Sequence, residues 1–159
     1  MGLSSQKDNF TQDGCAAARY HRYMNEHRSQ PQVFYPAMRF LDGEAAIHWL
    51  TEAFGFEESA SYRDDRGVIM HAEMRFRGAL MFFGQERESD YPVKPPGDDR
   101  PTGSVYVAVP ADEIEAHYER AKRAGARIFR ELRDTEYGSR EYSAYDCEGH
   151  PWSFGTYAP

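Results

Sequence analysis

The sequence has little of what marks a disulfide-linked, membrane-spanning or metal-cluster protein. Its 159 residues include two cysteines, Cys15 and Cys147, which are too few for a disulfide framework or a cysteine-based zinc site. No apolar run approaches the roughly 18 residues that a membrane span needs. The N-terminus lacks the basic-then-apolar order of a secretory signal. We therefore expect a reducing, cytoplasmic setting and no contact with a membrane.

Basic charge and ready-made catalytic motifs are also scarce. The net charge is −7, and residues 1–31 hold four basic and three acidic side chains, so that the remaining residues carry −8. Because nucleic-acid binders need basic patches, an acidic body argues against a nucleic-acid partner. It is compatible with a cationic small molecule, although acidic surface more often serves solubility. The sequence contains no nucleophile elbow, phosphate-binding loop or cysteine–histidine pair.

The sequence does contain an internal repeat of one unit. Four pairs of residues recur in the same order, 70 or 71 positions apart: Asp42 and Asp112, Gly55 and Gly125, Gly78 and Gly149, Gly84 and Gly155. Each copy has the pattern of a strand, a helix and three further strands. The strands are expected over residues 33–41, 56–63, 67–76 and 79–84, and over 104–109, 126–134, 140–146 and 150–157.

The two expected helices have matching start and stop signals. In the first copy, Asp42 is suited to cap the helix N-terminus and Gly55 to end the helix with a positive φ. In the second, Asp112 and Glu115 have the spacing of a capping box, and Gly125 ends the helix. Each helix carries one apolar stripe; the stripes are Ile47, Leu50 and Phe54, and Ile114, Tyr118 and Ala121.

These signals predict an α+β fold of two tandem βαβββ modules. The modules would form a concave mixed sheet around a cavity, with the helices on the outer face. The expected organisation is a polar N-terminal extension over 1–31, a first module over 32–84, a linker over 85–101 and a second module over 102–159. Residues 32–159 would then form one compact domain.

Three segments carry a resemblance to a known superfamily. They are "LDGEAAIHWLTEAFGF", "ERAKRAGARI" and "YSAYDCEGHPWSFGTY", and with the βαβββ duplication they resemble the glyoxalase, bleomycin-resistance and extradiol-dioxygenase superfamily, also called vicinal oxygen chelate proteins. The resemblance implies the fold but not one activity, because this fold hosts isomerases, dioxygenases, thiol transferases and metal-free drug binders. It also implies a homodimer that completes the cavity between subunits.

Enzymes of this superfamily usually hold a divalent metal with four histidine, glutamate or glutamine side chains, two from each module. The corresponding positions here are Tyr35, Phe82 (or Met81, if that hairpin is one residue out of register), Ser104 and Ser153. Because such metals need carboxylates or neutral histidines, this set predicts that the usual metal site is absent and that no cofactor is held there.

Strand alternation places further residues on the two faces. On the first strand, Tyr35, Ala37 and Arg39 would face the cavity, and Phe34, Met38 and Phe40 the core. In the second module, Ser104, Tyr106 and Ser153 would face the cavity, and Trp152 and Phe154 the core. The expected ligand-binding residues are therefore aromatic, hydroxyl-bearing or basic: Tyr35, Arg39, Phe82, Ser104, Tyr106 and Ser153.

The leading hypothesis is a metal-free protein that sequesters a small molecule in a partly aromatic cavity, as the bleomycin-resistance branch does. An alternative is a metal-dependent lyase, isomerase or dioxygenase with a shifted ligand set such as His71, Glu73 and His150. By itself, the His71–Glu73 pair reads more simply as a surface or cross-strand pair, and His150 as a local cap. Glu141 would suit a general base if it is buried. A third hypothesis is a scaffold that binds a partner through residues 1–31.

Overall fold

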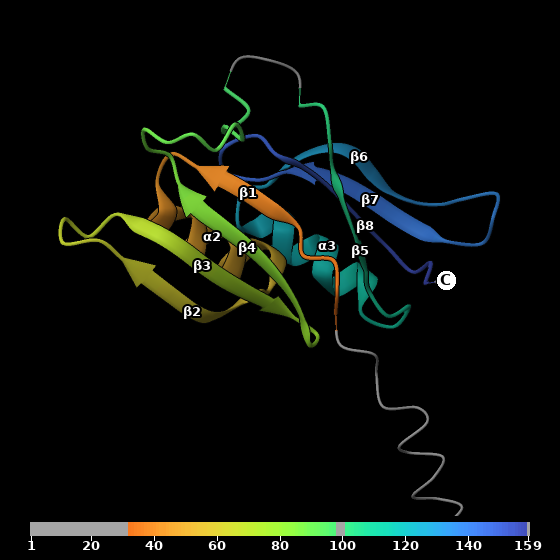
Figure 1. Cartoon of the computed structure of the whole chain (residues 1–159). Coiled ribbons are helices and arrows are strands. Elements are labelled where there is room, and N and C mark those ends of the chain that lie inside the picture. The colour runs from red at the N-terminus through yellow and green to blue at the C-terminus, as the bar shows by residue number, and fades with distance from the viewer. Residues whose placement is uncertain (1–31, 98–100, 159) are drawn as a thin grey trace, which may run out of the picture. The chain divides into compact units, whose positions relative to one another are not determined.

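A computed structural model describes residues 32–97 and 101–158, and Phe34–Pro159 form one compact unit (Figure 1). The expected extension over residues 1–31 lies outside the described residues. The first module contains β1 (Ala37–Phe40), α2 (Gly43–Phe54), β2 (Glu57–Arg63), β3 (Ile69–Phe76) and β4 (Ala79–Gln85). The second module contains β5 (Val105–Ala108), α3 (Ile114–Arg123), β6 (Arg127–Asp134), β7 (Arg140–Tyr145) and β8 (Pro151–Gly155).

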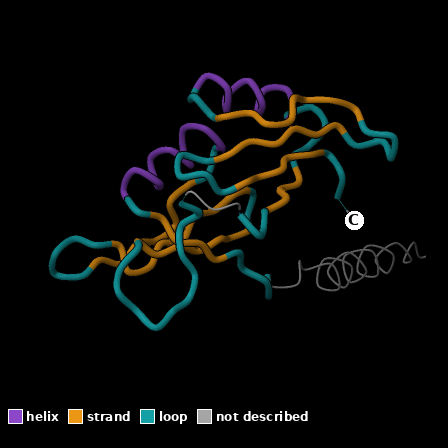
Figure 2. The backbone as a smooth tube through the Cα atoms, turned by 90° about the horizontal axis from the view of Figure 1, so that it is seen from above, coloured by secondary structure: helices purple, strands orange, loops and turns teal. Residues whose placement is uncertain are grey.

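Both modules have the same strand order, which confirms the tandem βαβββ architecture. The sheets run β1-β4-β3-β2 and β5-β8-β7-β6, and in each the first strand is parallel to the last while the other pairs are antiparallel. The registers also correspond, because Ala37 lies opposite Phe82 and Tyr106 lies opposite Ser153. Both helices lie on the same side of the strands (Figure 2). Within the described part of the chain, neither helix is long and apolar enough to cross a membrane.

Helix α2 begins and ends as the sequence predicts. The Asp42 side chain accepts a hydrogen bond from Ala45 N at 3.0 Å, and Gly55 adopts a φ of 74° at the C-terminal end. The apolar stripe of the helix is buried against the first sheet and the second module. Local signals therefore suffice for this element.

The start of α3 differs from the expected capping box. The residue that caps it is Glu113, whose side chain makes no capping hydrogen bond, and the first turn instead donates two backbone N–H groups to the Pro110 carbonyl. The Glu113 carboxylate is turned away to pair with Arg77 of the first module at 3.0 Å. A turn initiated at Pro110 thus replaces the Asp112 cap, so that prediction is wrong, while the stop at Gly125, with a φ of 84°, is correct.

One aromatic core is shared by the two modules. The ring of Phe54, at the end of α2, lies 4.6 Å from Phe154 and 5.6 Å from Trp152 of the second sheet. His117 of α3 is buried beside it: its Nε2 lies 2.9 Å from the Phe54 carbonyl oxygen, and its Nδ1 lies 2.7 Å from the Tyr142 hydroxyl. A full set of partners is what allows a histidine in a core.

The first strand is shorter than expected. Pro36 has no N–H to donate, so β1 begins at Ala37, and Phe34, expected in the core, is 87% exposed. Beyond Pro36 the alternation is as expected, because Phe40 is fully buried and Met38 packs against the core. The same holds for β8, where Trp152 and Phe154 are fully buried.

Candidate functional site

The open face of the first sheet carries a stacked aromatic pair. The rings of Tyr35 and Phe82 are 4.6 Å apart and nearly parallel, with an interplanar angle of 9°. Phe82 is half-buried on this face, whereas Met81 is 3% exposed and belongs to the core. The register left open by the sequence is therefore resolved in favour of Phe82. Tyr35 remains 38% exposed, which leaves one face of the pair accessible to a planar molecule.

A histidine–glutamate pair extends this aromatic surface along β3. His71 Nε2 lies 3.3 Å from Glu73 Oε1, and the His71 ring lies 5.0 Å from that of Phe82. Tyr62, opposite His71 on β2, completes the row with a ring distance of 6.0 Å. The two side chains share a face, as the spacing predicts, but two ligands make an incomplete metal site.

The corresponding face of the second sheet carries hydroxyl groups instead, and Ser143 on this face is only 2% exposed. Ser153 and Ser143 are hydrogen-bonded to each other at 3.0 Å. Tyr106 donates its hydroxyl to the Tyr157 carbonyl at 3.0 Å, and burial, with the nearby charge of Glu141, raises the pKa of Tyr106. Glu141 itself is buried and accepts a hydrogen bond from the Tyr137 hydroxyl at 2.8 Å. Its burial meets the condition set for a general base, and the side chain lies over Gly155 of β8, where an added Cβ would come within 2.7 Å of Glu141 Cγ.

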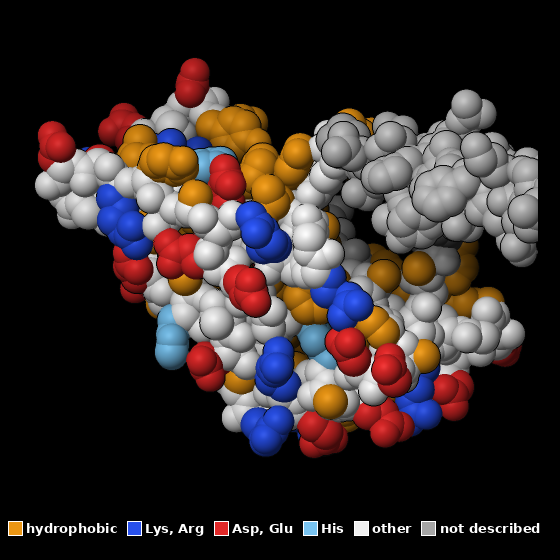
Figure 3. Space-filling view, turned by 90° about the horizontal axis from the view of Figure 1, so that it is seen from below, with side chains coloured by type: hydrophobic (Ala, Val, Ile, Leu, Met, Phe, Trp, Pro, Cys, Tyr) orange, Lys and Arg blue, Asp and Glu red, His pale blue; other side chains and the backbone are white. Residues whose placement is uncertain are grey.

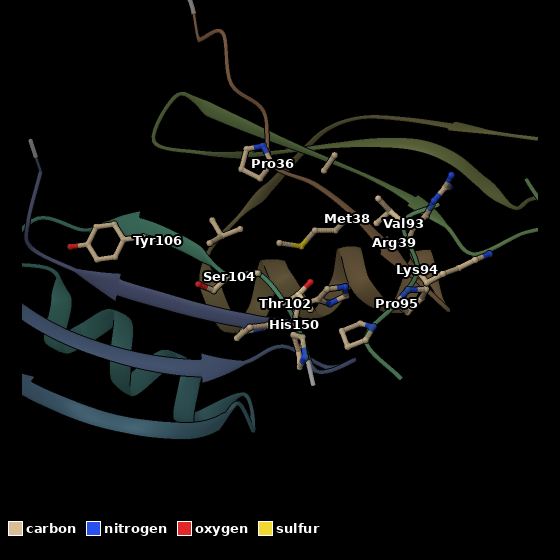
Figure 4. A pocket seen from close by; sticks show the side chains of 16 residues that line it. Pro36, Met38, Arg39, Val93, Lys94, Pro95, Thr102, Ser104, Tyr106 and His150 are labelled. Carbon is tan, nitrogen blue, oxygen red and sulfur yellow. The ribbon is translucent and has the colours of Figure 1, made fainter. Parts of the chain in front are cut away.

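A pocket of about 820 Å³ lies where the two modules meet. Figure 4 shows Met38 and Arg39 of β1 and, from the second module, Ser104, Tyr106 and His150 around the same space. The segments 93–96 and 101–103 of the linker region form the rest of the wall. Three of the six expected ligand residues line this pocket, namely Arg39, Ser104 and Tyr106.

The other three expected residues lie elsewhere. Tyr35 and Phe82 form the aromatic pair of the first sheet, and Ser153 is engaged with Ser143 on the second. The six residues therefore divide among an aromatic pair, a serine pair and a pocket. That any of them binds a ligand stays a prediction.

His150 is the residue of this region whose setting the sequence did not reveal. As expected it packs locally, with its Nδ1 held by Asp146 at 2.9 Å, but it also lines the pocket, which the sequence did not indicate. The signal was present in the spacing Asp146–Gly149–His150, which makes a tight turn between β7 and β8. Only the contact with β1, through the Phe40 ring at 4.6 Å, shows that the turn faces the other module.

The side chains that the resemblance places at the superfamily's usual metal positions have the wrong chemistry for a divalent ion. A phenol, a phenyl ring and two serine hydroxyls offer no carboxylate or imidazole. The shifted set is not assembled either: within residues 32–97 and 101–158, no three histidine, cysteine, aspartate or glutamate side chains converge, so His150 does not join His71 and Glu73.

The acidic excess does not form one large patch on the face shown in Figure 3, where acidic and basic side chains are interspersed. Ion pairs such as Arg63–Glu44 and Arg140–Glu115 also bring opposite charges together in the described part of the chain. Such a surface fits the solubility interpretation of the net charge better than a strong field that attracts a cation.

Comparison with known proteins places the chain in one superfamily. The model of the Glyoxalase/Bleomycin resistance protein/Dioxygenase superfamily matches residues 33–154. The proteins Mb0911c of Mycobacterium bovis and Rv0887c of Mycobacterium tuberculosis are 27% identical over 119 residues, which cover 72% of this chain and 76% and 68% of theirs.

Two solved structures have the same fold. TioX from Micromonospora sp. ML1 aligns with a TM-score of 0.63 and 29% identity over 80% of this chain and 98% of its own. The fosfomycin resistance protein FosX from Mesorhizobium loti aligns with a TM-score of 0.59 and 15% identity over 81% of this chain and 94% of its own. The family match, the duplicated modules and their shared core together show that the chain belongs to the Glyoxalase/Bleomycin resistance protein/Dioxygenase superfamily.

Proposed function

We propose that this protein binds and sequesters a small molecule with a planar group, and that it does so without a metal ion. The observation that carries the proposal is the accessible Tyr35–Phe82 stack, which offers a flat, preformed surface on an open sheet face. Stacking on an aromatic ring stabilises a planar ligand by about 0.5 to 1.5 kcal/mol beyond the area that is buried. The resemblance places the same rings at the positions where enzymes of the superfamily usually carry metal ligands.

The donor chemistry supports a binding role over metal-dependent catalysis. The Ser153 hydroxyl is hydrogen-bonded to that of Ser143. The imidazole and carboxylate of the His71–Glu73 pair lie 3.3 Å apart, with no third metal ligand beside them among the described residues. The fosfomycin resistance protein FosX from Listeria monocytogenes was crystallised with Mn(II), but at 14% identity it shares only the fold with this chain.

We further propose that the protein acts as a homodimer. Large aromatic side chains remain exposed on the open sheet faces, Tyr62 at 60% and Tyr106 at 43%. A second copy placed over these faces would bury them and turn two open surfaces into closed cavities. Burial of apolar surface is the main driving force for such an association.

The test is a calorimetric titration of bleomycin and a panel of planar aromatic antibiotics into the full chain. We expect binding to at least one compound, and a loss of about two- to tenfold in affinity for Tyr35→Ala, in line with the worth of one stacked ring. Phe34→Ala is the matched control, because it removes a neighbouring aromatic ring that is 87% exposed. Equal affinities of the wild type and Tyr35→Ala for every compound would overturn the proposal.

A metal measurement separates the proposal from the alternative enzyme. After dialysis against nickel, zinc, manganese and iron(II) and removal of free ion, elemental analysis should find the protein nearly free of metal. One tightly held equivalent per chain, lost in His71→Ala, would instead favour the metal-dependent lyase, isomerase or dioxygenase.

A further inference from the structure

The turn between β7 and β8 contains a buried aspartate–histidine pair. The Asp146 carboxylate accepts hydrogen bonds from His150 Nδ1 at 2.9 Å, from the backbone N–H groups of His150 and Glu148 at 2.9 and 3.0 Å, and from Trp152 Nε1 at 3.1 Å. Four donors converge on this one carboxylate, so its lone pairs are engaged within the turn. The pair is therefore a preformed aspartate acceptor with an imidazole held against it.

This arrangement decides which nitrogen of the imidazole is free. An ionised carboxylate has no proton to give, so Nδ1 of His150 carries the hydrogen, and in the neutral ring Nε2 presents a lone pair as an acceptor. His150 is 9% exposed, and its Nε2 is buried without a hydrogen-bond partner in the described part of the chain. Buried polar atoms are almost always satisfied, so an unpartnered one beside a pocket indicates where a ligand atom would bind.

The ring cannot readily swing away from this position. The Glu148 carboxylate, in the same turn, accepts hydrogen bonds from Leu41 N at 2.6 Å and Asp42 N at 2.9 Å at the start of α2. This contact clamps the turn to the first module and presses the imidazole against the Phe40 ring at 4.6 Å. His150 is thus a fixed part of the wall of the 820 Å³ pocket.

A second buried group in the same wall, Arg39, has no charged partner within the described part of the chain. It is 6% exposed, and its contacts are the Gln85 carbonyl, at 3.3 Å from Nη1, and the Tyr91 ring, whose centroid is 5.2 Å from Cζ. No carboxylate pairs with it among residues 32–97 and 101–158, whereas Lys94, also in the wall, is paired with Glu86. A buried guanidinium without a counter-charge is costly, and an oxyanion is the ligand group that would relieve it.

Glycine at position 84 supports this placement of Arg39. A Cβ built on Gly84 would come within 2.5 Å of Arg39 Nη1, so the guanidinium lies directly over the backbone of β4. A larger residue at this position would displace it. The hydroxyl-bearing residues Thr102 and Ser104 complete the polar part of the wall.

We infer that the pocket at the module junction binds an organic acid that also carries a hydroxyl group. Its carboxylate is held by Arg39, and its hydroxyl donates a hydrogen bond to Nε2 of His150, with Asp146 as the residue that positions the imidazole. The inference rests on Arg39 and His150 and not on the Tyr35–Phe82 pair, so it stands or falls separately from the proposed function. It also assigns the ligand an acidic group, where the net charge of the chain had suggested a cation.

The test compares benzoate with its ortho, meta and para hydroxy derivatives in calorimetric titrations of the full chain. Benzoate measures the affinity due to the carboxylate and ring alone, and the three isomers test how affinity depends on the position of the hydroxyl. At least one hydroxybenzoate should bind about three- to tenfold more tightly than benzoate, the worth of one hydrogen bond. Arg39→Gln should weaken all four acids by at least about tenfold, because it removes a charge-assisted contact.

His150→Phe should abolish the preference for the hydroxybenzoate while leaving benzoate binding nearly unchanged. The matched controls are Arg66→Gln and His48→Phe, which change an exposed arginine and an exposed histidine. Imidazole nitrogen NMR of the unmodified protein gives a second readout that needs no variant: His150 should show the Nδ1–H tautomer, and its Nε2 signal should shift on addition of the hydroxybenzoate.

Three outcomes would overturn the inference: no binding of any of the four acids at millimolar concentration, equal binding of benzoate and all hydroxybenzoates, or a hydroxybenzoate preference that survives in His150→Phe. If Arg39→Gln and His150→Phe behave as expected while Tyr35→Ala leaves every ligand unaffected, the acid site is upheld and the proposed role of the aromatic pair fails.

Discussion

The two modules have the same topology and opposite surface chemistry. Phe82 of β4 and Ser153 of β8 occupy corresponding positions in the repeat, yet the first stacks on Tyr35 and the second is hydrogen-bonded to Ser143. Their inward neighbours, Phe83 and Phe154, are both buried phenylalanines. The core face of the repeat thus keeps its chemistry because it must be packed, and the open face is free to differ because it is not.

The modules also differ in what they contribute to the core they share. Phe54 ends α2 and reaches into the second module, whereas the residue 70 positions later, Ala124, is small and packs only at the margin of the core. The second module contributes His117, whose ring lies against Phe54 and Phe76 of the first. The pseudo-symmetric repeat is therefore held together by an asymmetric contact.

The largest expected effect comes from breaking that contact. Phe54→Ala should lower the free energy of unfolding by about 3 to 5 kcal/mol, because it leaves a cavity among buried rings of both modules. Chemical denaturation followed by tryptophan fluorescence measures the loss. Phe34→Ala, at a ring that is 87% exposed, is the control and should change stability by no more than about 0.5 kcal/mol. Similar values for the two variants would mean that Phe54 does not join the modules.

A second prediction concerns the effect of acid on the buried His117, which the second module contributes to the shared core. Burial lowers the pKa of His117 to about 4, only partly offset by its hydrogen bond to the Phe54 carbonyl. In the unfolded chain the histidine binds this proton near pH 6.5. The contribution of the neutral ring to the free energy of unfolding is therefore fully present above about pH 6.5 and is lost as the pH falls towards 4. The loss is on the order of 3 kcal/mol, and urea unfolding at about pH 7 and about pH 4.5 should reveal most of it.

The control for the acid experiment replaces both hydrogen-bonded side chains together. In the double variant His117→Phe, Tyr142→Phe, the difference in stability between the two pH values should shrink, since no buried imidazole remains to be protonated. His48→Gln, at an exposed histidine of α2, should leave that difference as in the wild type. An unchanged difference in the double variant would contradict the assignment of the effect to His117.

The smallest effect distinguishes the two helix starts. Asp42→Ala removes a real cap, the 3.0 Å hydrogen bond to Ala45 N, and should cost about 1 kcal/mol. Asp112→Ala should be nearly neutral, because α3 begins after the Pro110 turn and its capping residue, Glu113, makes no side-chain cap. Thermal melts of the two single variants measure the contrast. Equal losses would restore the capping box that the sequence predicts.

The fold could be predicted from the sequence because its signals are local. Asp42, Gly55 and Gly125 mark helix ends through their own backbone preferences, and the alternation around Trp152 and Phe154 shows which face of β8 is buried. The failures have local causes that competed with those signals. Pro36 shortened β1 and left Phe34 exposed, and Pro110 took over the start of α3.

The sequence by itself determined the repeat and the superfamily, because each depends on which residue stands at which position. Only the tertiary structure decided that Arg39 is buried without a carboxylate partner in the described chain, and that His150, held by Asp146 and with an unpartnered Nε2, belongs to the wall of the same pocket. Arg39 and His150 are more than 100 positions apart in the sequence. Their placement in one pocket depends on how two modules pack, and no spacing within either module encodes it.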